Sequence, residues 1–166
     1  MNSIRISLGA VVLALSLVVG IGVASAASTS PGAAAKVSVA STGLGRVLVD
    51  GRGHTLYLFA KDTRAKSTCN GACAAFWPPL ITAGKPLAGS GVNATRLGTT
   101  RRADGRLQVT YNHHPLYLFA KDVRKGETKG EGLEAFGAEW YAVSAAGAKV
   151  ENASAPMGGY GYSNGY

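Results

Sequence analysis

Hydrophobic and polar residues alternate over short segments of this chain and are interrupted by turn residues, a pattern typical of β-strands. Residues 37–40, 46–49 and 55–60 form three such segments in the first half. The last two are separated by residues 50–53, in which Asp50 and Gly51 supply the positive φ angles that tight hairpin turns require. The pattern predicts a three-stranded meander.

The third segment continues into a heptapeptide, Leu-Tyr-Leu-Phe-Ala-Lys-Asp at 56–62, which returns unchanged at 116–122. In a strand, alternation places Tyr57 and Phe59 on one face and Leu56, Leu58 and Ala60 on the other. Both faces are apolar, so we expect a central strand.

The repeat extends beyond the heptapeptide. Residues 45–49 match 105–109, and His54 matches His114, at the same offset of sixty. Residues 77–84 match 140–147 at an offset of 63, so the copies differ in length between the heptapeptide and the tryptophan. We predict an all-β fold with minor helical turns at 67–76 and 132–136. Its two tandem meander repeats, 37–95 and 96–151, form one compact domain with pseudo-two-fold symmetry.

The ends of the chain differ from this pattern. Residues 1–26 read as a signal peptide: a basic start, an apolar run and the small residues Ala24-Ser25-Ala26 before the expected cleavage point. The alternative is an uncleaved anchor, because the apolar run is close to the length that spans a bilayer. After cleavage we expect no membrane span. Residues 27–36 read as a flexible linker, and 152–166 as a disordered Gly- and Tyr-rich tail.

The formal net charge is +8, and removal of the leader takes away only Arg5. An excess of cations attracts anionic polymers and surfaces through a field that salt screens. The alternative is that a basic surface only keeps the protein soluble.

Both copies contain the pattern Y-x-F-x-x-D, in residues Tyr57, Phe59, Asp62 and Tyr117, Phe119, Asp122. With this motif the chain resembles a family of secreted repeats and predicted lipoproteins that share a Y-x-[FWY]-x-x-D motif and occur largely in bacterial envelopes. The resemblance implies an exported bacterial protein of undefined molecular function. No cysteine lies at the leader boundary, so lipid anchoring is not carried across. From the residues themselves we expect a structural motif: the aromatic rings pack in the core, and each aspartate accepts backbone hydrogen bonds in the following turn.

Cys69 and Cys73 are the only cysteines, and an oxidising exported location predicts that they form a disulfide. The alternative is a metal or haem site that uses both thiolates with His54, His113 or His114. The spacing lacks the paired motif typical of zinc sites, so we predict no metal and no cofactor.

Four arginines, Arg96, Arg101, Arg102 and Arg106, form the densest basic cluster and are candidates for contact with an anionic polymer. No aromatic residues are interleaved with them, which argues against specific nucleic-acid recognition. No nucleophile elbow, phosphate-binding loop or zinc-protease motif occurs in the sequence. We therefore expect a non-catalytic extracellular or envelope-associated binding module, with a metal- or haem-binding protein as the alternative. The pattern leaves the oligomeric state open.

Overall fold

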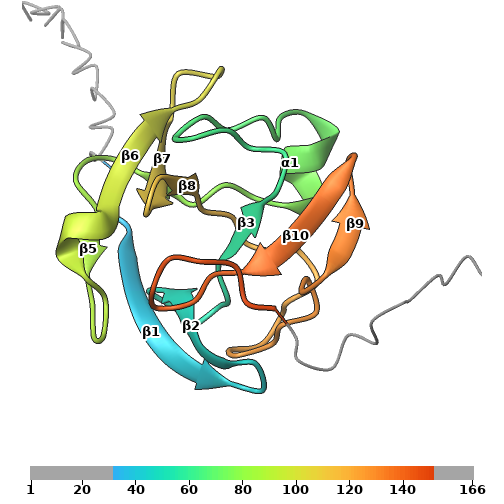
Figure 1. Ribbon diagram of the computed structural model, residues 1–166. Helices are drawn as coiled ribbons and strands as arrows, with labels where there is room; N and C mark the ends of the chain where they lie inside the picture. Colours follow the sequence, from blue (N-terminus) through green and yellow to red (C-terminus); the bar gives the residue numbers. More distant parts are fainter. Residues whose placement is uncertain (1–31, 152–166) are drawn as a thin grey trace, which may run out of the picture. The chain divides into compact units, whose positions relative to one another are not determined.

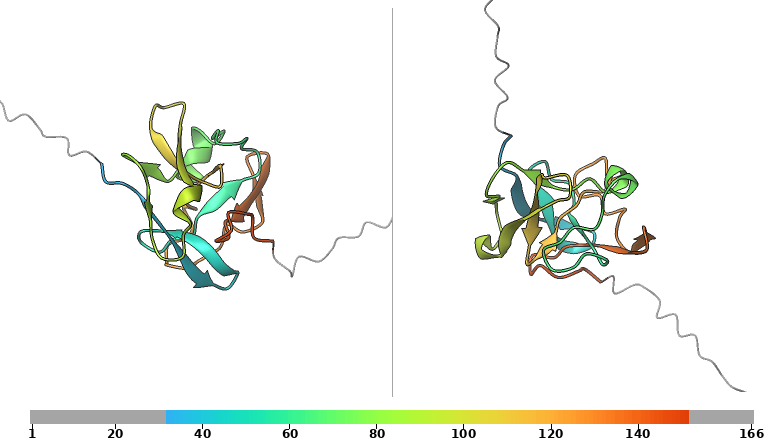
Figure 2. Two further views of the ribbon diagram at one scale, coloured as in Figure 1. Left: turned by 60° about the vertical axis from the view of Figure 1, so that its left-hand side comes forward. Right: turned by 90° about the horizontal axis from the view of Figure 1, so that it is seen from above.

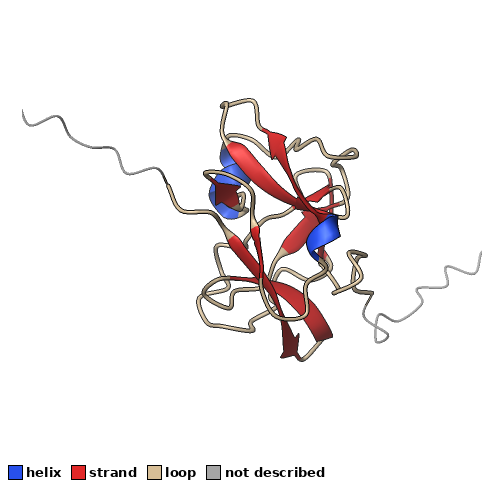
Figure 3. Ribbon diagram, turned by 90° about the vertical axis from the view of Figure 1, so that its left-hand side faces the viewer, coloured by secondary structure: helices blue, strands red, loops and turns tan. Residues whose placement is uncertain are grey.

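The computed structural model describes residues 32–151, which form short strands joined by long loops, with little helix (Figures 1 and 3). The first-half elements are β1 (Lys36–Thr42), β2 (Gly45–Asp50), β3 (Tyr57–Phe59), α1 (Ala72–Phe76), β4 (Ile81–Thr82) and β5 (Leu87–Ala88). The second-half elements are the 3-10 helix η1 (Ala94–Arg96), β6 (Leu97–Arg101), β7 (Leu107–Tyr111), β8 (His114–Pro115), β9 (Leu133–Ala135) and β10 (Ala138–Ala142). The strand-rich fold predicted from the sequence is confirmed.

The predicted leader and tail lie outside the described residues, as does the first half of the predicted linker, residues 27–31. The end of that linker belongs to the fold, contrary to our expectation. The Ala35 N–H donates to the Thr82 hydroxyl at 3.0 Å, and Lys36 pairs with Leu87 in β1. Within residues 32–151, no helix has the length and hydrophobicity needed to cross a bilayer.

The strands form three small sheets. β1 pairs antiparallel with β2 and parallel with β5, while β7 lies between β6 and β4 and also pairs with β8. The third sheet has the order β3-β10-β9. Figures 1 and 2 show β3 near the middle, with the β1–β2 hairpin, the β6–β7 hairpin and the β9–β10 hairpin around it.

The two copies are interwoven and do not form one sheet each. β3 belongs to the first copy, but its partner β10 belongs to the second, with Trp140 opposite Phe59. In the same way the second heptapeptide pairs with the first copy: the Leu118 N–H donates to Pro78 at 2.8 Å, and the Ala120 N–H donates to Phe76 at 2.9 Å. Each copy thus supplies a strand that completes the other, so neither can be complete alone.

The contacts across the middle are reciprocal, as a two-fold relationship requires. The Tyr57 N–H donates to the Tyr117 carbonyl at 2.8 Å, and the Tyr117 N–H donates to the Tyr57 carbonyl at 2.9 Å. The rings of Trp77 and Trp140 stack with centroids 3.9 Å apart and planes 3° apart. The predicted pseudo-symmetry therefore relates the hydrogen bonds as well as the sequence.

The register before the heptapeptides differs by one residue from the sequence match. The Leu56 N–H donates to Leu48, whereas the Leu116 N–H donates to Val109, so Leu48 corresponds to Val109 at an offset of 61. The reason is the hairpin. The first copy turns through residues 51–53, while the second turns through Asn112 and His113 alone, both at positive φ.

Alternation in the first heptapeptide divides its side chains between two cores. Tyr57 and Phe59 belong to one buried cluster, which also contains Trp77 and Trp140. Leu56 and Leu58 belong to another. Ala60, which we expected on the second face, is exposed because the strand has ended at Phe59.

The two predicted helical turns have different outcomes. α1 lies within the predicted 67–76 segment. The prediction for 132–136 is wrong, because Leu133–Ala135 is strand β9 and Phe136 and Gly137 turn the chain into β10.

Candidate functional site

The Y-x-F-x-x-D motifs meet across the pseudo-two-fold axis. The Tyr57 hydroxyl donates to Asp122 at 2.5 Å, and the Tyr117 hydroxyl donates to Asp62 at 2.6 Å. Each aspartate also fixes the loop that follows it. Asp62 accepts from the backbone and side chain of Thr68 at 2.7 and 2.8 Å, and Asp122 accepts from the Lys129 N–H at 3.0 Å.

Burial is the main influence on the pKa values of these two tyrosines and two aspartates. It raises the pKa of both tyrosine hydroxyls far above their ordinary value, and the neighbouring carboxylates raise it further. Burial also raises the pKa of Asp62 and Asp122, while the hydrogen bonds from the tyrosines act in the opposite direction. The phenols therefore remain donors. With every polar atom engaged in the fold, the arrangement is suited to joining the two copies.

The disulfide between Cys69 and Cys73 is present, as predicted. It lies beside Arg102, whose guanidinium donates to the Cys69 carbonyl and to the Gln108 side chain, both at 2.7 Å. Two further acceptors are the Ser67 hydroxyl at 2.7 Å and the Asn70 side chain at 3.0 Å. Arg102 is only 4% exposed and therefore anchors the disulfide loop to the β6–β7 hairpin.

This position does not fit the expectation that the four arginines Arg96, Arg101, Arg102 and Arg106 together contact an anionic polymer. Arg102 is in the interior, and Arg106 is paired with Asp104 at 2.7 Å. The Arg96 guanidinium donates to the Ala146 carbonyl. Arg101 is exposed and donates to the Gly105 carbonyl at 2.8 Å. The predicted cluster therefore contains a single exposed arginine that is not paired with a carboxylate.

The three histidines are not brought together. His54 lies 3.6 Å from Asp50 at one hairpin, and His113 contacts Arg64 at 2.7 Å at the other. Burial lowers the pKa of His114. No group of three or more His, Cys, Asp or Glu residues in the described part of the chain is placed to hold a metal. Since both cysteines are joined to each other, they are also not available as thiolate ligands.

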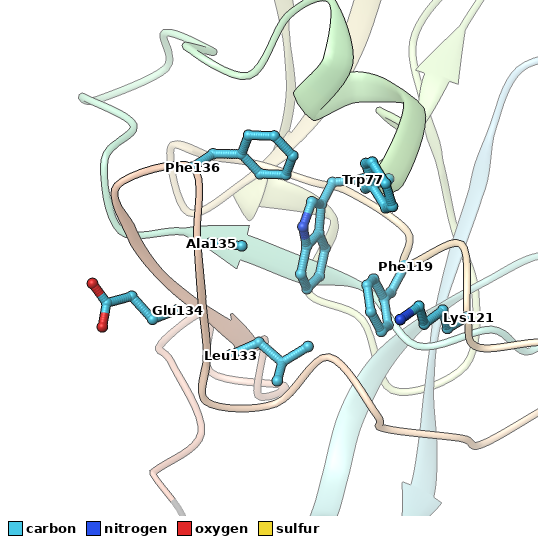
Figure 4. Close-up of a pocket in the computed structure, with 8 residues that line it drawn as sticks. Trp77, Phe119, Lys121, Leu133, Glu134, Ala135 and Phe136 are labelled. Carbon is cyan, nitrogen blue, oxygen red and sulfur yellow. The ribbon is translucent and has the colours of Figure 1, made fainter.

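An aromatic hollow of about 260 Å³ lies between α1 and the β9–β10 hairpin (Figure 4). We use this name for the space lined by Phe76, Trp77, Phe119, Lys121, Leu133, Glu134, Ala135 and Phe136. Trp77 and Phe119 are buried and stack with centroids 4.3 Å apart, while Phe76 is 51% and Phe136 41% exposed. The sequence pattern did not indicate this hollow. The available signal was an aromatic residue, Phe136, at a turn before glycine.

A family model described as a secreted repeat of unknown function matches residues 38–81 and 98–144, more than half of the chain. This chain belongs to that family. No curated protein and no solved structure matches it. The resemblance found from the motif is thus confirmed at the level of the family, which is described as secreted and without an assigned activity.

Each segment matched by the secreted-repeat family contains one heptapeptide and lies within one predicted repeat. The segments differ in what surrounds the shared motif. Cys69 and Cys73 lie only in the first, and the hairpin that carries Phe136 lies only in the second. The tyrosine–aspartate pairs are therefore common to both repeats, whereas the disulfide loop and the aromatic hollow distinguish them.

Proposed function

We propose that the protein is a non-catalytic binding module of a bacterial envelope or its surroundings, exported by the leader at 1–26, and that it contacts long anionic polymers. The observation that supports this is a pair of basic loops at equivalent places in the two repeats. Each loop follows the motif aspartate. We call Arg64, Lys66, Arg124 and Lys125 the loop cations; all four are exposed.

Both loops are held by the other repeat. The Ala65 N–H donates to His113 at 2.7 Å, and the Gly126 N–H donates to Gly53 at 3.1 Å. The loop cations thus lie on loops whose backbone is held by hydrogen bonds to the hairpin turns of the other repeat. A fixed backbone lowers the entropic cost of presenting these side chains to a partner.

The loop cations keep their charge available to a partner. The ion pairs of residues 32–151 involve other cations, namely His54, Arg102, Arg106, Lys129 and Lys149. Two basic loops on one chain favour a long polymer over a small anion, because the second contact is intramolecular once the first has formed. Each exposed charge contributes little alone, and salt weakens the sum.

The test is retention on an isolated anionic wall polymer over a salt series. Changing the four loop cations to Gln should reduce retention at low salt and flatten its dependence on salt. The matched control changes Lys36, Arg46, Lys85 and Arg101 to Gln, which removes the same charge from other exposed positions. Equal loss of retention in the two variants would mean that only net charge matters. Retention that is indifferent to salt would refute the electrostatic mechanism.

A further inference from the structure

The aromatic hollow brings together three exposed large hydrophobic residues. Five large hydrophobic residues are exposed within residues 32–151, and Phe76, Leu133 and Phe136 line this one hollow. Its rim carries one cation and one anion, Lys121 and Glu134, and so has no net charge. A neutral apolar occupant fits it better than the polyanion proposed above.

Phe136 has a left-handed backbone conformation that bulky residues disfavour. It has φ of 59° and the following Gly137 has φ of 85°, so both central residues of the β9–β10 turn are left-handed. Asn or Gly is favoured at the first of these positions, and a bulky side chain there costs roughly 1–2 kcal/mol. An unfavourable residue with its ring exposed at a hollow points to a role for that ring in contact with something else.

The hollow also offers a hydrogen-bond donor. The indole N–H of Trp140 donates to the Ala135 carbonyl at 3.1 Å. The equivalent indole of Trp77 has no such acceptor in the described part of the chain, and Figure 4 shows its nitrogen edge turned toward the hollow. Arg102 Nε is the one buried side-chain polar atom without a partner among the described residues, so the Trp77 nitrogen is accessible from the hollow. An occupant that brings an acceptor as well as an apolar group can therefore bond to it.

The last described residues run antiparallel to the end of β10. Lys149 pairs antiparallel with Val143, and the Val150 N–H donates to Ala142 at 2.8 Å. Both edges of β10 are occupied, by β3 and by β9, so a segment that continues from Glu151 to the turn that carries Phe136 has to pass over the β9–β10 hairpin. At about 3.3 Å per residue, the five residues of β10 span about 16 Å. The fifteen residues beyond Glu151 can extend over about 50 Å.

The side chains of residues 152–166 suit a neutral, aromatic hollow. Residues 152–166 contain no charged side chain, and they contain Met157, Tyr160, Tyr162 and Tyr166. A tyrosine supplies an aromatic ring together with a hydroxyl that can accept a hydrogen bond. The volume is slightly below the roughly 300–1,000 Å³ of small-molecule sites and suits an inserted side chain.

We propose that the C-terminal segment 157–166 folds back along the β9–β10 hairpin and seats a tyrosine side chain in the aromatic hollow. The ring packs against Phe76 and Phe136, and its hydroxyl accepts from the Trp77 indole. The segment then acts as an internal ligand, and an outside ligand with the same chemistry has to displace it.

The experiment uses residues 27–166 and NMR chemical shifts. The tail variant carries Tyr160→Ser, Tyr162→Ser and Tyr166→Ser, and the matched control carries Ser163→Ala and Asn164→Ala. We expect the tail variant alone to shift the Trp77 indole N–H and the Phe136 and Gly137 amides, with Gln108 and Val109 unchanged. A peptide of residues 152–166 added to the tail variant should reverse these shifts in a saturable way. Phe136→Asn, which the turn favours, should abolish the effect of the peptide.

Three results would overturn the proposal. The first is identical hollow resonances in the wild type and the tail variant. The second is a peptide that causes no shift. The third is a set of shifts that depends on protein concentration, because the occupant would then belong to a second copy of the chain.

Discussion

The Tyr57 hydroxyl donates to Asp122 across 65 positions of sequence, and this bond has a counterpart in the one between Tyr117 and Asp62. Each motif is therefore completed by the other copy. The tyrosine of one repeat donates to the motif aspartate of the other, while that aspartate orders the loop beyond it. A repeat isolated from its partner would leave both groups without these bonds, which gives a physical reason for finding two copies in one chain.

Removing either hydroxyl should destabilise the fold unequally. Tyr57→Phe takes a donor from Asp122 and an acceptor from the buried Gly130 N–H, which lies 3.3 Å from the hydroxyl. Tyr117→Phe removes bonds to Asp62 and to the Ser67 hydroxyl, but Asp62 keeps both bonds from Thr68 and Ser67 keeps the bond from Arg102. We expect losses of about 2–3 kcal/mol for Tyr57→Phe and about 1–2 kcal/mol for Tyr117→Phe. Urea unfolding measures both. A larger loss for Tyr117→Phe would contradict this ranking.

The same two tyrosines should make the protein sensitive to alkali. The pKa of each is raised in the folded state, so above about pH 10 the unfolded chain loses protons that the folded chain keeps. The free energy of unfolding then falls as pH rises, by about 1.4 kcal/mol per pH unit for each tyrosine. Denaturant titrations between pH 9 and 11 should show a shallower fall in Tyr57→Phe than in the wild type. Parallel curves would mean that Tyr57 ionises in the folded protein.

Changing Arg102 to Gln should destabilise the fold much more than changing its neighbour Arg101 to Gln. Arg102→Gln leaves four acceptors around the disulfide loop without their donor, so we expect a loss of more than about 2 kcal/mol. Arg101→Gln changes an exposed side chain and should alter stability by less than about 0.5 kcal/mol. Thermal unfolding of the two variants at equal concentration is the comparison. Similar melting temperatures would show that the buried arginine is dispensable.

Reduction of the disulfide should weaken the fold only moderately. The bridge joins residues four apart, and closure of so small a ring is worth about 2 kcal/mol in the chain-entropy model. We expect the wild type to lose about this amount in reductant while remaining folded. The Cys69→Ala, Cys73→Ala protein is the control and should not respond to reductant. Complete unfolding on reduction would show that the loop has a larger role through Arg102.

Phe136→Asn should stabilise the protein by about 1 kcal/mol, because Asn adopts the left-handed conformation of the turn more readily than Phe. The control is Phe76→Asn on the other wall of the hollow. Phe76 ends a helix without positive φ, so this change relieves no backbone strain. Chemical denaturation of both variants tests the prediction. Destabilisation by Phe136→Asn would mean that the ring contributes more through packing than the turn loses through strain.

Local patterns in the sequence determined much of this protein. Apolar alternation correctly divided Tyr57 and Phe59 from Leu56 and Leu58, because a strand sends successive side chains to opposite faces wherever it lies. Cys69 and Cys73 are the only cysteines, so an oxidising location was sufficient to predict their disulfide. The repeated heptapeptide likewise indicated the family and the two-fold relationship.

The tertiary structure alone decided which copy pairs with which. Alternation specifies the faces of a strand but not its neighbour, so β3 could have paired within its own repeat, whereas it pairs with β10. The burial of Arg102 was equally hidden, because three of its four acceptors, at Ser67, Cys69 and Asn70, lie 32–35 positions away. The hollow arises where α1 meets the β9–β10 hairpin, elements that are distant in sequence. These groups are brought together by pairing between elements that are distant in sequence, and local patterns of apolar and polar residues do not specify such pairing.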